Sequence, residues 1–232
     1  LRIFVFTAGS SLTAAQPMNN VVRTSVEAVA AALAGVQTMH VCAYDEALGV
    51  PTEAAATLAL RTQQIVAFET GLTETVDPLA GSYAVETLTD QLDAEITAAL
   101  ADIEDRGGAL ACIESGWFVE QLADAAYAHQ QAVESGRSAV VGVNRFASPP
   151  EPIEVFAIDP ALEAEQVAAV AKVRAERDAD TVRRALAAVR EAASSGANVV
   201  EPCVTAVRAY ATVGEIVGVL RAVHGSWHPA SS

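Results

Sequence analysis

The sequence predicts an α/β protein in which strand–loop–helix units are followed by a mainly helical region. Two observations lead to this class. The apolar segment LRIFVF (residues 1–6) runs through a polar Gly/Ser/Gln/Asn loop into a long alanine-rich helix, and the same order recurs from residue 36. Beyond residue 75 strand-like segments become rare and long helical patterns dominate. We therefore expect two regions, residues 1–75 and 76–232.

The first unit consists of a strand, a loop and a helix. Residues 3–6 are all β-branched or aromatic, as in a strand that is buried on both faces. Apolar residues then recur at helical spacing from Val22 to Leu33, and Gly35 fits a C-terminal helix cap. The loop between them lies at the carboxyl end of the strand, where parallel α/β proteins bind their ligands.

The second unit repeats this order. A short strand is expected at residues 38–43, with a polar exit at residues 44–46. Thr52 caps a helix that runs to about Thr70 and ends at Gly71. Two such units leave sheet edges and faces uncovered, so we expect residues 1–75 to be the last part of a larger α/β barrel.

The remainder of the chain is predicted to be mainly helical. One strand-like segment, SAVVGVNRF, interrupts it, and the segment SPPEPIEVFAIDP forms a proline-rich loop around a short extended piece. The expected helices cover residues 85–105, 116–134, 161–177 and 180–193, followed by a helix pair that ends near His224.

Composition and charge exclude several classes of function. The 232 residues carry 14 Lys and Arg against 29 Asp and Glu, a net charge of −15. An extended phosphate backbone would meet net repulsion, so nucleic acid and anionic membranes are not expected as partners. No apolar run reaches transmembrane length, and no basic, apolar signal segment opens the chain. Leu1 in place of Met suggests that the natural chain starts earlier.

The cysteines argue against a disulfide framework and against a structural zinc site. Cys42, Cys112 and Cys203 are odd in number, far apart and not in C-x-x-C spacing. A reducing, cytoplasmic location is the expectation. His129, His224 and His228 share no ligand spacing either, so no metal site is predicted.

Four polar residues near the two strands resemble catalytic groups, but structural roles are favoured. Asn19 and Asn20 stand at a helix start, where asparagine usually acts as a cap. Arg23, one turn further on, is expected to pair with a carboxylate. His40 is expected to be a hydrogen-bonded structural histidine.

Several longer stretches resemble the methylmalonyl-CoA mutase family. They occur in the family's order and cover almost the whole chain. They are TAGSSLTAAQPMNNVVRT, GVQTMHVCAYDEALGVPTE, LRTQQIVAFETG, DPLAGSYAVETLTDQL, VGVNRF, KVRAERD and ATVGEIVGVLRAVHG. The resemblance implies the C-terminal part of the large, catalytic subunit: the end of a TIM (β/α)8 barrel followed by a mainly α-helical region.

The resemblance also implies an activity. Family members are adenosylcobalamin-dependent isomerases that rearrange the carbon skeleton of an acyl-CoA by radical chemistry, of the methylmalonyl-CoA/succinyl-CoA type or of a relative such as isobutyryl-CoA mutase. The D-x-H-x-x-G motif, whose histidine ligates cobalt in the family, does not occur in this sequence. The implied partners are therefore the remainder of the barrel and a cobalamin-binding domain or small subunit, with an acyl-CoA as substrate.

Four residues match family positions at the cofactor. Gly9 in TAG corresponds to a glycine whose backbone lies against the corrin, and Gln37 to a glutamine near the adenosyl group. Glu46 in DEAL corresponds to the glutamate that accepts hydrogen bonds from the adenosyl ribose. Gly49 stands where many relatives have an alanine beside the cofactor.

Three residues depart from the family's pattern. Phe4 and Phe6 stand where relatives commonly have a histidine and a glutamine, and Cys42 replaces the usual asparagine. Phenylalanine rings neither donate nor accept hydrogen bonds, which leaves two interpretations open. The site is adapted to a less polar acyl group, or the chain is a non-catalytic scaffold subunit or remnant.

Overall fold

A computed structural model describes residues 2–149, 152–153 and 155–228. The chain divides between Ala157 and Ile158 into two compact units. The fold is mostly helical, and the strands within the described residues form one two-stranded sheet. No helix in the described part of the chain is both long and apolar enough for a membrane span.

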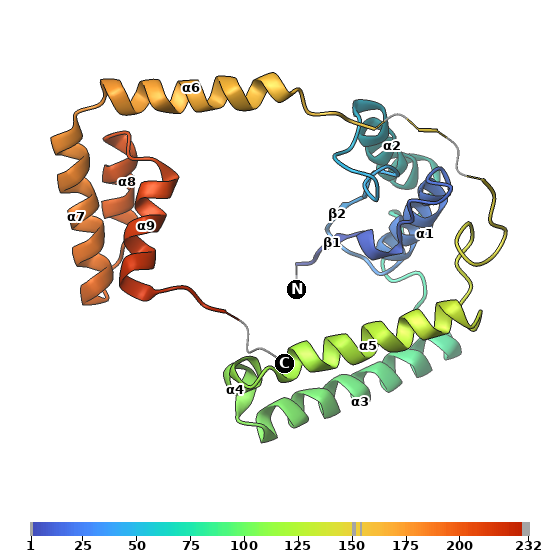
Figure 1. The fold of residues 1–232 in the computed structure, drawn as a ribbon. Helices are drawn as coiled ribbons and strands as arrows, with labels where there is room; N and C mark the ends of the chain where they lie inside the picture. The colour runs from blue at the N-terminus through green and yellow to red at the C-terminus, as the bar shows by residue number, and fades with distance from the viewer. Residues whose placement is uncertain (1, 150–151, 154, 229–232) are drawn as a thin grey trace. The chain divides into compact units, whose positions relative to one another are not determined.

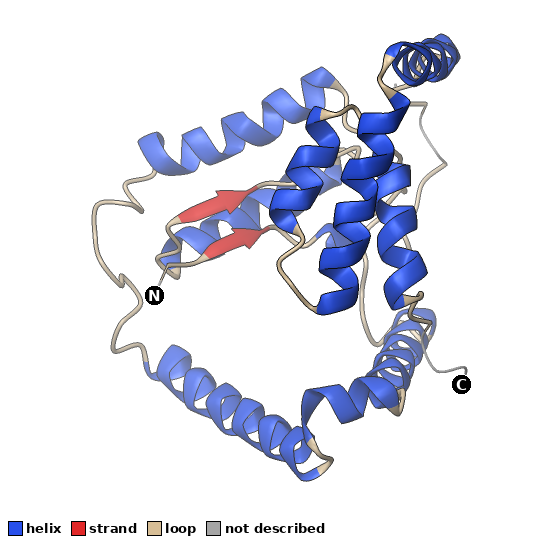
Figure 2. Ribbon diagram, turned by 90° about the vertical axis from the view of Figure 1, so that its left-hand side faces the viewer, coloured by secondary structure: helices blue, strands red, loops and turns tan. Residues whose placement is uncertain are grey.

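The first unit opens with two strand–loop–helix repeats, as predicted (Figure 1). Strands β1 and β2 run parallel, with Val5 opposite Met39 (Figure 2). Both strands are shorter than the apolar segments from which they were predicted. The elements are β1 (Phe4–Phe6), the 3-10 turn η1 (Gly9–Ser11), α1 (Asn19–Leu33), β2 (Thr38–His40) and α2 (Glu53–Glu69).

The core of these repeats is made of small residues. Ala28 of α1, Val41 after β2 and Ala55 of α2 are almost completely buried and belong to one cluster. Alanine at the contact points lets the two helices approach each other and the strand closely. The alanine-rich composition is therefore a packing requirement as well as a source of helix propensity.

The prediction that the first strand is buried on both faces is wrong for this chain. Phe4 and Phe6 are 55% and 65% exposed. Met39, opposite Val5 in the ladder, packs on the helical core, whereas Phe4 and Phe6 point to the other face. The helices of this chain cover one face of the sheet, so alternate residues of β1 remain open to solvent.

The rest of the first unit contains the two long helices that were predicted and a short helix, α4, that was not, and one predicted strand is missing from the described residues. The predicted strand at residues 138–146 is a turn closed by an isolated bridge between Val141 and Arg145. Asn144 accepts from the Val140 N–H at 2.7 Å and donates to the carbonyls of Val133 and Ser138. A side chain thus satisfies backbone groups that a second strand would otherwise pair. The helices are α3 (Tyr83–Asp105), α4 (Gly108–Glu114) and α5 (Trp117–Glu134).

The proline-rich segment predicted as a loop lies partly outside the described residues, at positions 150, 151 and 154. Its described residues form no helix or strand before α6 begins at Pro160. Asp159 caps that helix, since its side chain accepts from the Ala161 N–H at 2.9 Å.

The second unit consists of four helices, and all four were predicted. Helix α7 packs against α8 and α9 (Figure 1) around a core that includes Val182, Val189 and Ala206. The helices are α6 (Pro160–Glu176), α7 (Ala179–Ser195), α8 (Val200–Arg208) and α9 (Val213–His224).

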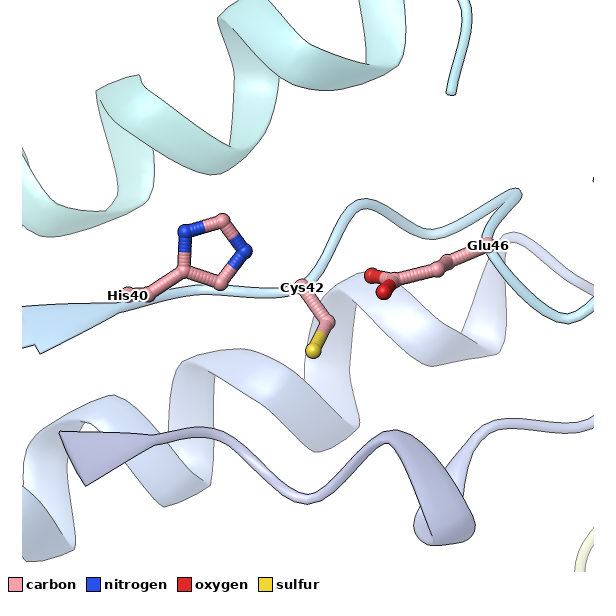
Figure 3. A group of neighbouring side chains, drawn as sticks. All are labelled: His40, Cys42 and Glu46. Atoms are coloured by element: carbon pink, nitrogen blue, oxygen red, sulfur yellow. The ribbon is translucent and has the colours of Figure 1, made fainter. Parts of the chain in front are cut away.

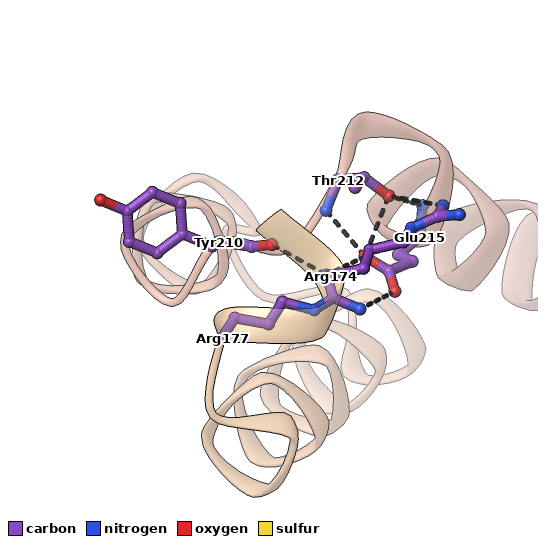
Figure 4. Close-up of polar contacts among 5 residues, drawn as sticks. All are labelled: Arg174, Arg177, Tyr210, Thr212 and Glu215. Atoms are coloured by element: carbon purple, nitrogen blue, oxygen red, sulfur yellow. Dashed lines mark hydrogen bonds and ion pairs between the residues drawn. The ribbon is translucent and has the colours of Figure 1, made fainter. Parts of the chain in front are cut away.

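An ion pair between the partly buried side chains of Arg177 and Glu215 stabilises the start of α9 (Figure 4). The Arg177 guanidinium donates to both carboxylate oxygens of Glu215, at 2.7 and 2.5 Å, and to the Tyr210 carbonyl at 2.8 Å. Glu215 and Thr212 also form a reciprocal capping box. The hydrogen bonds from Arg177 hold the pKa of Glu215 at about 2, below its usual 4.5, against the opposing effect of burial.

We predict that Glu215→Gln destabilises α9 by about 1 kcal/mol, because the charged pair with Arg177 is lost while the glutamine oxygen can still accept from the Thr212 N–H. Hydrogen exchange of the α9 amides in the complete protein measures this effect. Glu163→Gln, at an exposed position in α6, is the control and should leave α9 unchanged. Equal effects of the two substitutions would contradict the assigned role of the pair.

The same pair predicts a pH dependence of α9. Because folding lowers the pKa of Glu215, its stabilising contribution is present above the unfolded pKa of 4.5 and is lost as the pH falls towards about 2. Protection of the α9 amides, corrected for intrinsic exchange rates, should decline across that interval. In Glu215→Gln the contribution of this residue is absent throughout, so the decline should be smaller.

Candidate functional site

The carboxyl ends of β1 and β2 meet at one edge of the sheet and continue into the two polar loops. Thr7, which is 5% exposed, joins the two exits. Its N–H donates to the His40 carbonyl at 2.9 Å, and its Oγ1 accepts from the Cys42 N–H at 2.8 Å. The Thr7 hydroxyl thus adds one hydrogen bond between the two strand exits, beyond the last paired residues of β1 and β2.

Asn20 connects the first loop with the second strand exit. This residue is fully buried, and its Oδ1 accepts from the Thr13 N–H at 3.1 Å and from Arg23 at 2.6 Å. Its Nδ2 donates to the carbonyls of Thr13 and Tyr44, at 2.9 and 2.8 Å. The side chain makes all four of the hydrogen bonds available to an amide. The structural role expected for Asn20 is confirmed, although Met18 and not an asparagine is the cap residue of α1.

Among the described residues Arg23 pairs with no carboxylate, so the expected ion pair is not found there. Its guanidinium donates to Asn20 Oδ1, to Thr13 Oγ1 at 3.0 Å and to the Val141 carbonyl at 2.7 Å. Its partners are therefore neutral oxygens, two from the nearby residues Thr13 and Asn20 and one from the distant Val141. Arg23 therefore fastens the turn near residue 141 to the first loop.

Asp45, a residue that the sequence did not single out, positions the start of α2. Its carboxylate is 1% exposed, and Oδ2 accepts from the N–H and the hydroxyl of Thr52 at 2.8 and 2.9 Å. Thr52 in turn caps α2, as predicted. The sequence offered one signal for Asp45, which is an acidic residue next to Glu46. The structure separates the two residues, because Asp45 is buried and Glu46 is exposed.

The structure places three of the four predicted site residues at this edge. Gly9 begins η1 after β1, while Glu46 and Gly49 follow β2. A Cβ added to Gly9 would meet no described protein atom within 4 Å, and Gly9 does not have a positive φ. At Gly49 an added Cβ would lie 3.9 Å from Val155, an ordinary contact. Neither glycine is therefore required by the packing of the described chain.

Gln37 lies at the opposite end of the strands. It precedes β2, and its Oε1 accepts from the Ile3 N–H at 2.6 Å while its Nε2 donates to the Gly35 carbonyl at 2.9 Å. The structure therefore does not bring Gln37 together with Gly9 and Glu46. Its contact with a cofactor stays a prediction.

His40, Cys42 and Glu46 gather where β2 ends (Figure 3), and their potential ligand atoms all lie within 4.8 Å of one another. His40 is exposed, makes no side-chain hydrogen bond within the described part of the chain, and packs against Phe6 at 5.1 Å between ring centroids. It is thus not the hydrogen-bonded histidine that the sequence suggested. Burial, reinforced by the Glu46 carboxylate, raises the pKa of the Cys42 thiol above 9.0 despite a hydrogen bond with Thr7.

A cavity of about 490 Å³ lies beside the first loop. Gln16, Asn19, Tyr44 and Ser148 are among its lining residues. Gln16 closes one side by donating to the Phe146 carbonyl and to the Ser148 hydroxyl, at 2.9 and 2.8 Å. Tyr44 of the second strand exit lines this cavity, whereas Gly9 and Glu46 do not, so the cavity is separate from those two predicted site residues.

Polar loops that follow neighbouring parallel strands at one edge are typical of α/β proteins that bind a ligand there. Sequence comparison identifies the family: the methylmalonyl-CoA mutase family model matches residues 1–226, and the chain belongs to that family. The resemblance inferred from the sequence is confirmed.

Individual relatives agree with this assignment. The chain is 42% identical over 230 residues to the 2-hydroxyisobutanoyl-CoA mutase large subunit of Aquincola tertiaricarbonis, covering 98% of this chain and 41% of that protein. It is 41% identical to methylmalonyl-CoA mutase of Escherichia coli (strain K12), covering 93% and 30%. It is 38% identical to human mitochondrial methylmalonyl-CoA mutase, covering 97% and 30%. The chain thus spans less than half of the length of these relatives.

We predict that Asn20→Ala destabilises the two loops by about 3 kcal/mol, because it leaves buried N–H and carbonyl groups without partners. Hydrogen exchange at the amides of α1 and of residues 41–46 in the complete protein measures this effect. The neighbouring Asn19→Ala, which loses one half-buried bond to Gln16, should cost less than about 1 kcal/mol. Equal costs would contradict the connecting role of Asn20.

Proposed function

We propose that this chain forms part of the large subunit of an adenosylcobalamin-dependent acyl-CoA mutase, an isomerase that rearranges an acyl-CoA carbon skeleton. Membership of the methylmalonyl-CoA mutase family carries this proposal. All of the relatives compared above are named as acyl-CoA mutases. The acyl group itself is not specified by the described residues.

The residues at the strand exits fit the cofactor. Glu46 offers an exposed carboxylate, and a carboxylate suits two neighbouring ribose hydroxyls because it is purely an acceptor. Gly9 leaves open space where a Cβ would stand, so a flat ring system can approach its backbone. At Gly49 the space is smaller, because an added Cβ would make an ordinary contact with Val155 at 3.9 Å. Because the packing of the described chain does not require glycine at position 9, the close approach of a ligand would explain why a glycine stands there.

In this proposal the chain binds and orients while the cofactor supplies the radical chemistry. Glu46 accepts hydrogen bonds from the ribose and holds the adenosyl group in one orientation. Asn20 and Thr7 hold the two loops together through buried hydrogen bonds, and Asp45 adds the bonds that its Oδ2 accepts from Thr52. Phe4 and Phe6, with ring centroids 4.7 Å apart, present an apolar face that excludes water from the reacting groups.

The two parallel strands are best explained as the last strands of a TIM (β/α)8 barrel. The exposed outer edge and face of the sheet require neighbouring strands and a filled interior. We therefore propose that the remainder of the barrel packs on Phe4 and Phe6. A cobalamin-binding domain or small subunit would supply the ligand to cobalt, because the D-x-H-x-x-G motif does not occur in this sequence.

We predict that Glu46→Ala in the assembled protein weakens adenosylcobalamin binding about tenfold or more, since charged hydrogen bonds are lost. Equilibrium dialysis with adenosylcobalamin measures this, and turnover of an acyl-CoA panel measures its consequence. Glu69→Ala, at the last residue of α2, is the control and should bind normally. Unchanged binding and turnover in Glu46→Ala would favour the alternative, a non-catalytic scaffold subunit.

Gly9→Ala separates a ligand requirement from a structural one. Thermal stability should change by less than about 0.5 kcal/mol, because the added methyl group meets open space. Adenosylcobalamin binding should weaken at least several-fold, because the methyl group obstructs the approach of the corrin. A stable variant with normal cofactor affinity would place the corrin elsewhere.

A further inference from the structure

We propose that His40, Cys42 and Glu46 form a binding site for a single thiophilic divalent cation of the zinc class. The three residues offer one nitrogen, one sulfur and one oxygen ligand within 4.8 Å of one another. In Figure 3 the Cys42 sulfur lies between the imidazole of His40 and the carboxylate of Glu46. The proposal rests on this geometry and does not depend on the proposed function.

The distances are close to those of a formed site. Zinc binds sulfur at about 2.3 Å and nitrogen or oxygen at about 2.0–2.2 Å, which places tetrahedral ligand atoms about 3.5 Å apart. Closing the present arrangement therefore requires shifts of about 1 Å. His40 and Glu46 are exposed and free to make them by changing rotamer, whereas Cys42 is 5% exposed and stays in place.

The backbone holds the three residues in one place. Thr7 binds the Cys42 N–H, and its own N–H is bonded to the carbonyl of His40. Asn20 binds the carbonyl of Tyr44, and Asp45 anchors the next turn through Thr52. Phe6 supports one side of the imidazole. The ligand-bearing segment is therefore ordered before any cation arrives, which lowers the entropic cost of binding.

The donor set selects the cation. A thiolate and an imidazole favour zinc and similar metals over Mg²⁺ or Ca²⁺, which prefer oxygen ligands. Three protein ligands leave a fourth position open to water or to another ligand. On binding, the Cys42 sulfur donates an electron pair to the cation and its proton passes to water, with no change of oxidation state. The nearby carboxylate of Glu27 adds negative potential at the site.

The site overlaps the one proposed for the cofactor, since Glu46 belongs to both. A cation that engages the Glu46 carboxylate removes the acceptor offered to the adenosyl ribose. Zinc and adenosylcobalamin should therefore compete. Cys42 supplies the sulfur ligand at a position where the family resemblance implies an asparagine. We therefore expect this competition in chains that have a cysteine at that position.

Cobalt(II) titration of the complete protein, freed of cobalamin and treated with a chelator, tests the site directly. One equivalent of Co²⁺ should give a thiolate-to-cobalt charge-transfer band, and Zn²⁺ should displace it. Cys42→Asn should abolish the band, and His40→Gln should weaken binding by about tenfold or more. The matched controls Cys203→Ser and His129→Gln should leave the band unchanged. Circular dichroism verifies that each variant is folded.

Two results would overturn the proposal. One is the absence of a charge-transfer band in the folded protein at millimolar Co²⁺. The other is a band that survives in Cys42→Asn or disappears in Cys203→Ser. A separate dialysis experiment measures adenosylcobalamin binding with and without Zn²⁺. Cation binding without competition would confirm the metal site while contradicting the cofactor role of Glu46, so failure of either proposal is recognised separately.

Discussion

The four hydrogen bonds of the buried Asn20 amide are the constraint on which the arrangement of the site depends. They bind the first loop to itself at Thr13 and to the second strand exit at Tyr44. An amide in this position has no access to water, so each unmade bond would cost free energy without compensation. These bonds therefore hold the first loop and the exit of β2 in one relative position.

Buried and exposed polar groups differ in what they contact at the strand exits. Thr7, Asn20 and Asp45 each form at least one buried or part-buried hydrogen bond with the backbone, and these bonds fix its course. Glu46 stands one residue after Asp45, yet its carboxylate is exposed and available to a ligand. Two adjacent acidic residues thus have different roles because one points inward. The same rigid frame that would orient a nucleoside also collects the ligands for a cation.

The two units are stabilised by different means. The first relies on alanine-mediated contacts between helices and strand exits, together with paired buried polar groups. The second combines a valine- and alanine-lined core with an ion pair at the start of α9. Arg177 reaches Glu215 and the Tyr210 carbonyl, so one side chain joins the end of α6 to the α8–α9 connection.

Periodicity, caps and breakers were local enough for the sequence alone to determine nearly all helices and the positions of both strands, whereas the family followed from the resemblance of longer stretches. Thr52 as a cap and Gly35 after α1 are examples, since neighbouring residues decide their geometry. Only the tertiary structure decided which polar residues act together. The predicted strand at 138–146 failed because Asn144 reaches the Val133 carbonyl, 11 residues away. Gln37 and Glu46, both singled out in the sequence, lie at opposite ends of β2, while Cys42 joins His40 and Glu46. Side-chain direction at the end of a strand depends on distant partners such as Thr7 and Asn20, and spacing along the chain does not encode them.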